Sequence, residues 1–263
     1  MSADAMLKVE AVNKSFGGVK VVQDVSFSVA RGGRTALIGP NGAGKTTMFN
    51  LISGVIGMDS GAITLDEARI DHLPARKRIG VGLSRSFQNI RLMPHLSVVE
   101  NILLGQHSRI GGLGELFAPI GWISSAPARA EAMRRLSEAG VDVDPDAPVA
   151  GLPYGTRKRI EVVRALMSQP RLLILDEPAA GLNPRETADL STFLKSATAD
   201  GLTLLVVEHD MAFVHGLCDH TVVLNFGRLI YDGPTAGVRD DAAVREAYLG
   251  ARAATVGGAG RAA

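Results

Sequence analysis

Cysteine is almost absent from the sequence, which contains only Cys218 among its 263 residues. A lone cysteine cannot close a disulfide within the chain, and no redox or metal-ligand spacing surrounds it. A single cysteine fits either a protein of the reducing cytosol or an unreactive buried thiol. We favour the buried thiol because no redox or metal-binding motif surrounds Cys218. A fold that depends on internal disulfides is therefore excluded.

An excess of charge of one sign is also lacking, because 28 Lys and Arg residues face 27 Asp and Glu residues. The steady positive field of a nucleic-acid-binding protein is missing, so we expect no nucleic-acid partner. No apolar run approaches the roughly 20 residues that span a bilayer. The first twelve residues carry Asp4, Lys8 and Glu10 where an export signal needs apolar residues, so we expect no export. Any membrane association would come through partner proteins.

The sequence does contain enough apolar residues for one well-filled core. Hydrophobic residues make up 46% and charged residues 21% of the chain, which argues against disorder over most of its length. This length and composition fit a single α/β domain with an inserted subdomain.

Short apolar and β-branched runs predict the strands, and helical spacing predicts the helices. We expect strands at Leu7–Val12, Val25–Val29, Thr35–Ile38, Ala62–Leu65, Leu172–Leu175 and Leu204–Val207, and a final hairpin of Thr221–Leu224 and Arg228–Tyr231. We expect helices at Lys45–Ser53, Ser97–Leu104, Ala126–Ala139, Arg157–Met167 and Ala242–Leu249. Buried strands that alternate with helices indicate a doubly wound parallel sheet.

A helical insertion interrupts this alternation between about Gln88 and Met167. Within it, the stretch Ile110–Pro127 is rich in Gly and Pro and also carries large apolar residues. It fits either a membrane-dipping element or an apolar loop packed on the helices, and we favour the loop because Gly and Pro break an amphipathic helix. The Gly/Ala/Arg-rich tail at 250–263 is expected to be disordered.

A glycine-rich loop joins the strand Thr35–Ile38 to the helix that begins at Lys45. Its residues, Gly39, Pro40, Asn41, Gly42, Ala43, Gly44, Lys45 and Thr46, followed by Thr47, have the spacing of a phosphate-binding loop in the required strand–loop–helix context. Glycines let backbone N–H groups turn toward phosphate oxygens, and the helix adds its positive end. We expect Lys45 to contact the β- and γ-phosphates and Thr46 to ligate Mg²⁺.

Two adjacent carboxylates, Asp176 and Glu177, follow the apolar run Leu172–Leu175. Consecutive residues at a strand end point in different directions, so the two side chains can have separate roles. We expect Asp176 to hold Mg²⁺ and Glu177 to act as general base on the attacking water. Without the glycine loop, an ordinary acidic strand end would be the better interpretation.

With these motifs in place, the sequence resembles the ATPases of ABC transporters, whose motifs occur here in order over residues 7–249. Gln88 resembles the glutamine that senses Mg²⁺ and water and links to the membrane subunits. His209 resembles the histidine that contacts the γ-phosphate, and Phe16 resembles the aromatic residue that stacks on adenine. The segment Gly151–Thr156 lies where the family signature binds the ATP of the opposite subunit, through Leu152 and Gly155, and Ala180–Asn183 resembles the loop that crosses the dimer interface.

The resemblance implies an α/β fold with a P-loop NTPase (RecA-like) core, an N-terminal antiparallel β subdomain and an α-helical subdomain inserted at about residues 89–168. It implies ATP and Mg²⁺ as cofactors and hydrolysis coupled to transport. The implied partners are a second ATPase subunit, identical or related, two transmembrane permease subunits and, indirectly, an extracytoplasmic solute-binding protein. The implied location is the cytoplasmic face of the bacterial inner membrane, as a peripheral subunit.

Finer details resemble one subgroup, the ATPases of branched-chain (hydrophobic) amino-acid importers. They are the segments Leu175–Pro184, Val207–Met211, Ser86–Gln88 and Ala247–Gly250. Relatives in this subgroup also carry amides or aromatic acids, so the solute stays open.

The sequence disfavours two functions other than transport. A soluble ABC ATPase that acts on ribosomes or nucleic acid usually has two ATPase halves or long coiled-coil arms, and the sequence shows neither a second phosphate loop nor sustained heptads. A scaffold that binds ATP without turnover is disfavoured by the intact set of Lys45, Asp176, Glu177 and His209.

The signature departs from the usual Leu-Ser-Gly-Gly-Gln, because Pro153, Tyr154 and Thr156 replace its Ser, first Gly and Gln. One hydroxyl contact to the γ-phosphate is thereby lost, while Gly155 and the helix N-terminus remain. In the interface loop, Asn183 replaces the common aspartate but can still form hydrogen bonds. We hypothesise that this signature faces the phosphate loop of a different subunit, which makes the two ATP sites unequal.

Restoring the hydroxyl with Pro153→Ser tests whether its loss matters. A hydrogen bond to a charged group contributes roughly 1.5–3 kcal/mol, so ATP affinity or turnover of the assembled complex should rise. Unchanged affinity and rate would show that the missing hydroxyl is immaterial.

Overall fold

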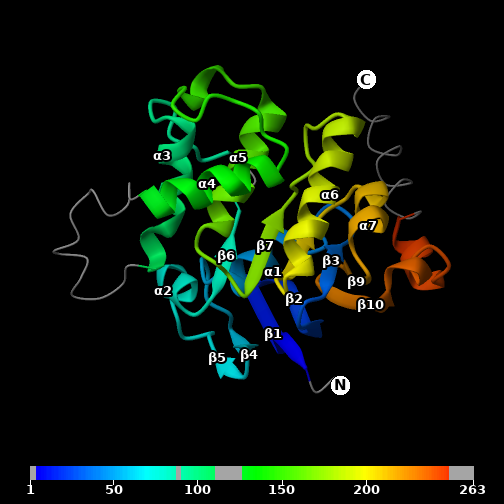
Figure 1. Ribbon diagram of the computed structural model, residues 1–263. Helices are drawn as coiled ribbons and strands as arrows, with labels where there is room; N and C mark the ends of the chain where they lie inside the picture. The colour runs from blue at the N-terminus through cyan, green and yellow to red at the C-terminus, as the bar shows by residue number, and fades with distance from the viewer. Residues whose placement is uncertain (1–3, 87–89, 110–125, 249–263) are drawn as a thin grey trace, which may run out of the picture.

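The computed structural model describes residues 4–86, 90–109 and 126–248. Gln88, the expected tail at 250–263 and nearly all of the Ile110–Pro127 stretch lie outside these ranges. Figure 1 shows a sheet of early strands at one end of the molecule, a central sheet, and helices grouped around it.

The first sheet is antiparallel and has the strand order β2-β1-β4-β5. Its strands are β1 (Ala5–Phe16), β2 (Val19–Ala30), β4 (Ser60–Leu65) and β5 (Ala68–Arg69). The hairpin of β1 and β2 turns at Gly17 and Gly18, both with positive φ, a conformation that glycine adopts without steric cost. Both strands run several residues beyond the expected Leu7–Val12 and Val25–Val29, so that Phe16 is the last residue of β1.

The central sheet has the order β10-β9-β3-β8-β7-β6. Its strands are β3 (Arg34–Ile38), β6 (Leu83–Arg85), β7 (Leu172–Asp176), β8 (Thr203–Val207), β9 (His220–Asn225) and β10 (Arg228–Pro234). All neighbours are parallel except β10, which pairs antiparallel with β9. The carboxyl ends of β3, β7 and β8 therefore meet at one edge of the sheet.

Helices cover both faces of the central sheet. They are α1 (Lys45–Ile52), α2 (Ala75–Gly80), α3 (Val98–Leu103), α4 (Ala126–Glu138), α5 (Tyr154–Leu166), α6 (Pro184–Ala199) and α7 (Met211–Leu217), with 3-10 turns η1 (Leu104–Arg109), η4 (Val149–Gly151) and η5 (Thr235–Gly237), and a last helix at 242–248. In Figure 1, α3, α4 and α5 group together, apart from α6 and α7. This group lies between β6 and β7 in the chain and forms the helical insertion.

Alternate residues of the buried strands belong to two separate apolar cores. Leu173 and Leu175 of β7 pack with the core that contains α3 to α7, whereas Leu172 and Ile174 pack with the core that contains α1 and the antiparallel sheet. The strands β3 and β8 alternate in the same way. Because both faces are covered, these strands read as continuous apolar runs without polar alternation.

Side-chain caps define where several helices begin. Ser97 and Glu100 form a capping box at α3, and Asn183 and Glu186 form another at α6. Asp210 accepts from two backbone N–H groups at the start of α7. These are the residue types that favour the first turn of a helix, and they fix the loops after β7 and β8 in place.

The fold class expected from the sequence is confirmed, and further local differences concern α5, β6 and α2. Helix α5 begins at Tyr154, three residues before the expected Arg157, and Pro153 is its N-cap. Strand β6 and helix α2 were not expected, because both are very short. In the part of the chain that the structure describes, no helix is long and apolar enough to cross a membrane.

Candidate nucleotide site

The glycine loop between β3 and α1 depends on its glycines for steric reasons. Gly39 and Gly44 have φ of 151° and 98°. A Cβ atom on Gly39 would lie 2.1 Å from the carbonyl oxygen of Leu224 in β9, and one on Gly44 would lie 2.8 Å from that of Val21 in β2. The loop backbone is thus pressed between two strands in a conformation that only glycine allows.

Lys45, the first residue of α1, lies inside the curve of this loop and is only 8% exposed. Its ammonium donates to the carbonyl oxygens of Gly39 at 2.6 Å and Pro40 at 3.0 Å. Burial lowers the pKa of Lys45, while the nearby charges of Glu177 and Asp176 oppose this shift. A flexible cation at this place can exchange loop carbonyls for phosphate oxygens.

The first turn of α1 is open to an anion. Its N-cap is Gly44, which has no side chain to cap the first N–H groups. Asn41, Gly42 and Thr46 are exposed here, and Thr47 is half-buried. A triphosphate would therefore meet backbone N–H groups, the positive helix end and the Thr46 hydroxyl together.

Asp176 ends β7 at the same edge of the sheet and is 7% exposed. Burial raises the pKa of its carboxyl to about 6, and the charge of Glu177 contributes to the shift. Its backbone N–H donates to Oγ of Ser86 at 3.4 Å. The segment that leads toward Gln88 therefore passes beside Asp176, although Gln88 itself lies outside the described residues.

Glu177 leaves the strand direction because its φ is +46°, in the left-handed region. Its backbone N–H donates to the carbonyl oxygen of Val207 at the end of β8, at 2.8 Å. Its Oε1 lies 3.4 Å from Nδ1 of His209, whose side chain is 60% exposed. Glu177 and His209 thus meet at one place, while the neighbouring Asp176 is more deeply buried.

Glu208 organises the two loops around these residues, a role that the sequence analysis did not assign. It is fully buried, and its Oε1 accepts from the N–H of Ala179 at 2.9 Å. Its Oε2 accepts from the N–H groups of His209 at 2.9 Å and Asp210 at 3.3 Å. The sequence signal for this role is an acidic residue directly after the buried run Leu204–Val207. A buried carboxylate at that position needs hydrogen-bond donors, which the neighbouring backbone supplies.

The signature residues form a second group, at the start of α5. The ring of Tyr154 lies over Gly181, where a Cβ would come within 2.9 Å of its Cε1. Gly155 is buried against the carboxylate of Glu186. A Cβ atom placed on Gly155 would lie 2.4 Å from Oε1 of Glu186. Leu152 precedes them and packs against the core of the helices. Tyr154 and Gly155 therefore lie beside the loop Ala180–Asn183 and the first turn of α6 in the same chain.

Phe16 lies at the end of the β1–β2 hairpin, beside the glycine loop. Phe16 pairs with Val19 across the hairpin. Two residues after Val19, the carbonyl oxygen of Val21 lies against Gly44 of the glycine loop. Phe16 is 47% exposed, and the ammonium of Lys14 lies 5.3 Å from its ring centroid. An exposed aromatic ring at this place is available for stacking.

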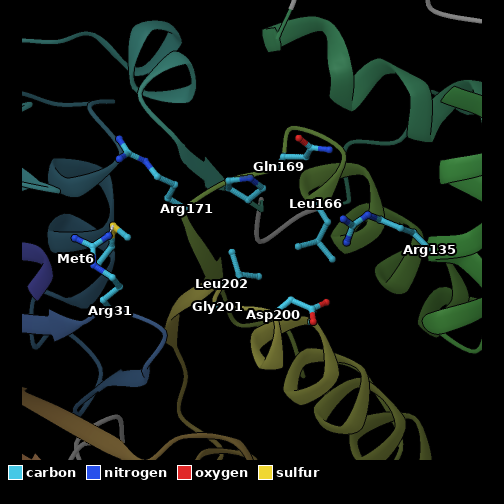
Figure 2. A pocket seen from close by; sticks show the side chains of 11 residues that line it. Met6, Arg31, Arg135, Leu166, Gln169, Arg171, Asp200, Gly201 and Leu202 are labelled. Carbon is cyan, nitrogen blue, oxygen red and sulfur yellow. Dashed lines mark hydrogen bonds between the residues drawn. The ribbon is translucent and has the colours of Figure 1, made fainter. Parts of the chain in front are cut away.

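A separate cavity of about 360 Å³ lies at the other end of the parallel strands. Figure 2 shows Arg171 and Leu202, which immediately precede β7 and β8, on its wall together with Arg31 and Arg135. Each of these arginines is already paired with a carboxylate, Arg31 and Arg171 with Asp66 and Arg135 with Glu131. The cavity is therefore a poor match for a phosphate group.

Together, the glycine loop, Lys45 and the carboxylates at the ends of neighbouring strands define a P-loop NTPase site. The family comparison agrees, since the chain matches the ABC transporter family over residues 22–180. This chain belongs to the ABC transporter family and is an ATPase of that family. The resemblance noted in its sequence is confirmed.

Its relatives include full-length matches. The chain is 39% identical to the high-affinity branched-chain amino acid transport ATP-binding protein BraF of Pseudomonas aeruginosa, over 93% of this chain and 98% of that protein. It is 36% identical to the corresponding protein LivG of Escherichia coli, with the same coverage. A solved ATP-binding cassette of an ABC transporter in its ADP conformation has a TM-score of 0.83 and 31% identity over 94% of this chain and 99% of that one. A nucleotide-free cassette has a TM-score of 0.82 and 30% identity, over 93% of this chain and 98% of that one.

The raised pKa of Asp176 predicts a pH-dependent cost to stability. The folded state favours the protonated carboxyl, so the cost is absent below the ordinary pKa of 3.8 and complete once the pH exceeds about 6. Asp176→Asn removes it, and in nucleotide-free protein at pH 8 this should raise the free energy of unfolding by roughly 1–3 kcal/mol. Urea denaturation between pH 4 and pH 8 measures the difference, which should vanish toward pH 4.

Asp240→Asn is the matched control, because Asp240 is exposed and its substitution should change stability little at any pH. An equal effect of Asp176→Asn at pH 4 and pH 8 would contradict the buried-charge explanation.

Proposed function

We propose that this chain powers an importer of branched-chain or other hydrophobic amino acids, or of related small solutes. The support is the full-length similarity to two proteins whose names describe high-affinity branched-chain amino acid transport. Relatives and solved cassettes of ABC transporters give no support to the alternative of a ribosome- or nucleic-acid-bound ATPase.

The proposal that the chain hydrolyses ATP with Glu177 as general base rests on the contact between Glu177 and His209, close to Lys45. Glu177 is one residue beyond Asp176, and its carboxylate is 27% exposed, so water can reach it. In our proposal Glu177 takes a proton from the attacking water as general base. His209 Nδ1, 3.4 Å from that carboxylate, orients it and contacts the γ-phosphate.

The residues of the loop fit ATP with Mg²⁺. Lys45, the loop N–H groups and the α1 N-terminus would hold the phosphates, and Phe16 would stack on the base. Among the described residues no cluster of three or more His, Cys, Asp and Glu side chains could hold a metal ion. Mg²⁺ is usually held by one or two carboxylates together with phosphates, so we assign Asp176, Thr46 and Gln88 to the ion. When bound, Mg²⁺ would supply positive charge that stabilises the negative charge developing on the phosphate oxygens during hydrolysis.

The resemblance of residues 151–156 to the family signature supports a dimer. Gly155 lies against Glu186, next to the loop Ala180–Asn183 that resembles the dimer-interface loop, and we propose that Leu152 and Gly155 contact ATP held by a second ATPase subunit. The altered signature, with Pro153 and Tyr154, favours a related rather than an identical partner. We assign residues 7–249 to this one nucleotide-binding domain.

The remaining partners follow from the proposed transport. Two transmembrane permease subunits would receive the motion through Gln88 and the helices α3 to α5, and an extracytoplasmic solute-binding protein would deliver the solute. The chain would then work at the cytoplasmic face of the bacterial inner membrane. Closure and reopening of the ATPase dimer would switch the permease between its two states.

Glu177→Gln tests the catalytic assignment. The amide cannot accept the water proton, so phosphate release should fall by roughly 10²-fold or more while ATP binding is retained. In vesicles that contain the assembled transporter, ATP-driven uptake of labelled leucine should stop as well. The control Glu67→Gln changes an exposed carboxylate in the turn before β5 and should leave both measurements intact.

Normal hydrolysis by Glu177→Gln would overturn the role of Glu177. Normal hydrolysis without uptake of any hydrophobic amino acid by the unaltered transporter would instead overturn the assignment of the solute.

A further inference from the structure

A buried lysine on the signature helix reaches the peptide that carries the proposed base. Lys158 lies in α5 and is only 3% exposed. Its ammonium donates to the backbone carbonyl oxygen of Glu177 at 3.0 Å. A buried ammonium is costly unless it has partners, so a lysine at a core-facing helix position is rare unless its charge is used.

The peptide that Lys158 holds can form hydrogen bonds only through its carbonyl oxygen. Residue 178 is proline, so the peptide bond between Glu177 and Pro178 has no N–H, and its carbonyl oxygen is its only hydrogen-bonding group. That oxygen also accepts from the N–H of Ala180 at 3.2 Å. The φ of +46° at Glu177 is unfavourable both for a non-glycine residue and for a residue that precedes proline. Such a conformation persists only where its surroundings fix it.

The direction of the Glu177 carboxylate depends on this conformation. On its N-terminal side the residue is held by the bond from its N–H to Val207 in β8, and on its C-terminal side by Lys158 and Ala180. A rotation of this carbonyl after loss of the Lys158 hydrogen bond would change the backbone angles of Glu177 and move its side chain away from His209. The contact of 3.4 Å between Glu177 Oε1 and His209 Nδ1 therefore depends on the Lys158 hydrogen bond.

The charges around Lys158 explain why a cation stands there. Glu161, Glu208, Asp176 and Glu177 all attract its ammonium, and the first three are at most 7% exposed. Burial lowers the pKa of Lys158, and these carboxylates oppose the shift. An ammonium can thus balance several buried negative charges while it holds one carbonyl oxygen.

Lys158 also joins the two groups of the nucleotide site. It lies one helical turn after Tyr154, whose ring covers Gly181, and three residues after Gly155, which lies against Glu186. The ammonium at the other end of its side chain lies at the end of β7. A shift of the start of α5 therefore acts directly on the Glu177–Pro178 peptide.

We propose that Lys158 is a positioning residue for ATP hydrolysis: it fixes the Glu177–Pro178 peptide so that the Glu177 carboxylate faces the reacting water, and it ties this geometry to the signature helix. The inference rests on the proposed role of Glu177 as general base. It assigns to Lys158 no contact with nucleotide.

The test replaces Lys158 by methionine, which keeps the length of the side chain and removes both the charge and the donor. In the assembled transporter complex, kcat for ATP hydrolysis should fall about tenfold or more, while KM and the affinity for a fluorescent ATP analogue stay within about twofold. Lys158→Arg, which keeps charge and donors, should recover most of the lost rate. Lys195→Met makes the same change on an exposed face of α6 and should leave kcat unaltered.

Two further variants keep the proposal falsifiable if Lys158→Met is poorly folded, as judged by its Tm and analogue binding. Lys158→Gln retains an uncharged donor and should be milder than Lys158→Met in kcat. In the Glu177→Gln background, Lys158→Met should cause no further loss of kcat, because both changes disable the same group.

The outcomes separate this inference from the proposed base. A normal kcat for Lys158→Met or Lys158→Gln, a loss confined to KM and analogue affinity, or a full additional loss in the Glu177→Gln background would each overturn the positioning role. Normal hydrolysis by Glu177→Gln alone would remove the base assignment on which the inference rests.

Discussion

The structure depends on charge that is removed from water at the carboxyl ends of β3, β7 and β8. Asp176 and Glu208 are buried there, and the ammonium groups of Lys45 and Lys158 are buried beside them. Buried charges are costly unless they are paired and hydrogen-bonded. Here the ammonium groups bind backbone carbonyl oxygens and Glu208 binds backbone N–H groups, so charged side chains determine the conformation of the surrounding loops.

The parallel sheet makes this concentration of charge possible. Both faces of β3, β7 and β8 are covered by apolar cores, so the charged groups of these strands lie at or beyond their ends. At that edge, Glu208 joins the loops after β7 and β8, and Lys158 joins the end of β7 to α5. A nucleoside triphosphate brings negative charge to Lys45, whose present partners are loop carbonyl oxygens that it can exchange. Binding at this edge can therefore alter the loops after β7 and β8, which in our proposal reach the partner subunit.

Most of this site could be predicted from the sequence because its residues follow short motifs with a local physical reason. The phosphate loop needs glycines at fixed positions, and Asp176, Glu177 and His209 come directly after buried strands. The fold class followed from the same alternation of buried runs and helices. The chain as described bears this out for the central sheet and the helical insertion.

What could not be predicted depends on contacts between distant segments. Lys158 and Glu177 are 19 residues apart, and neither residue indicates the other in the sequence. The early start of α5 has the same origin, because Tyr154 and Gly155 are poor helix formers whose helical conformation is supported by Gly181 and Glu186 across the interface loop. The two short elements β6 and α2 offer too few residues for a periodic pattern.

The most direct measurement of the central claim is calorimetric titration of Mg-ATP into the purified full-length chain and into its Lys45→Met variant. If the buried charges at the strand ends hold the triphosphate, the unaltered chain binds one Mg-ATP, and loss of the Lys45 charge weakens the affinity by about tenfold or more, as expected for a charge-assisted contact. Equal affinity in the two proteins, or no binding by the unaltered chain, would contradict the account.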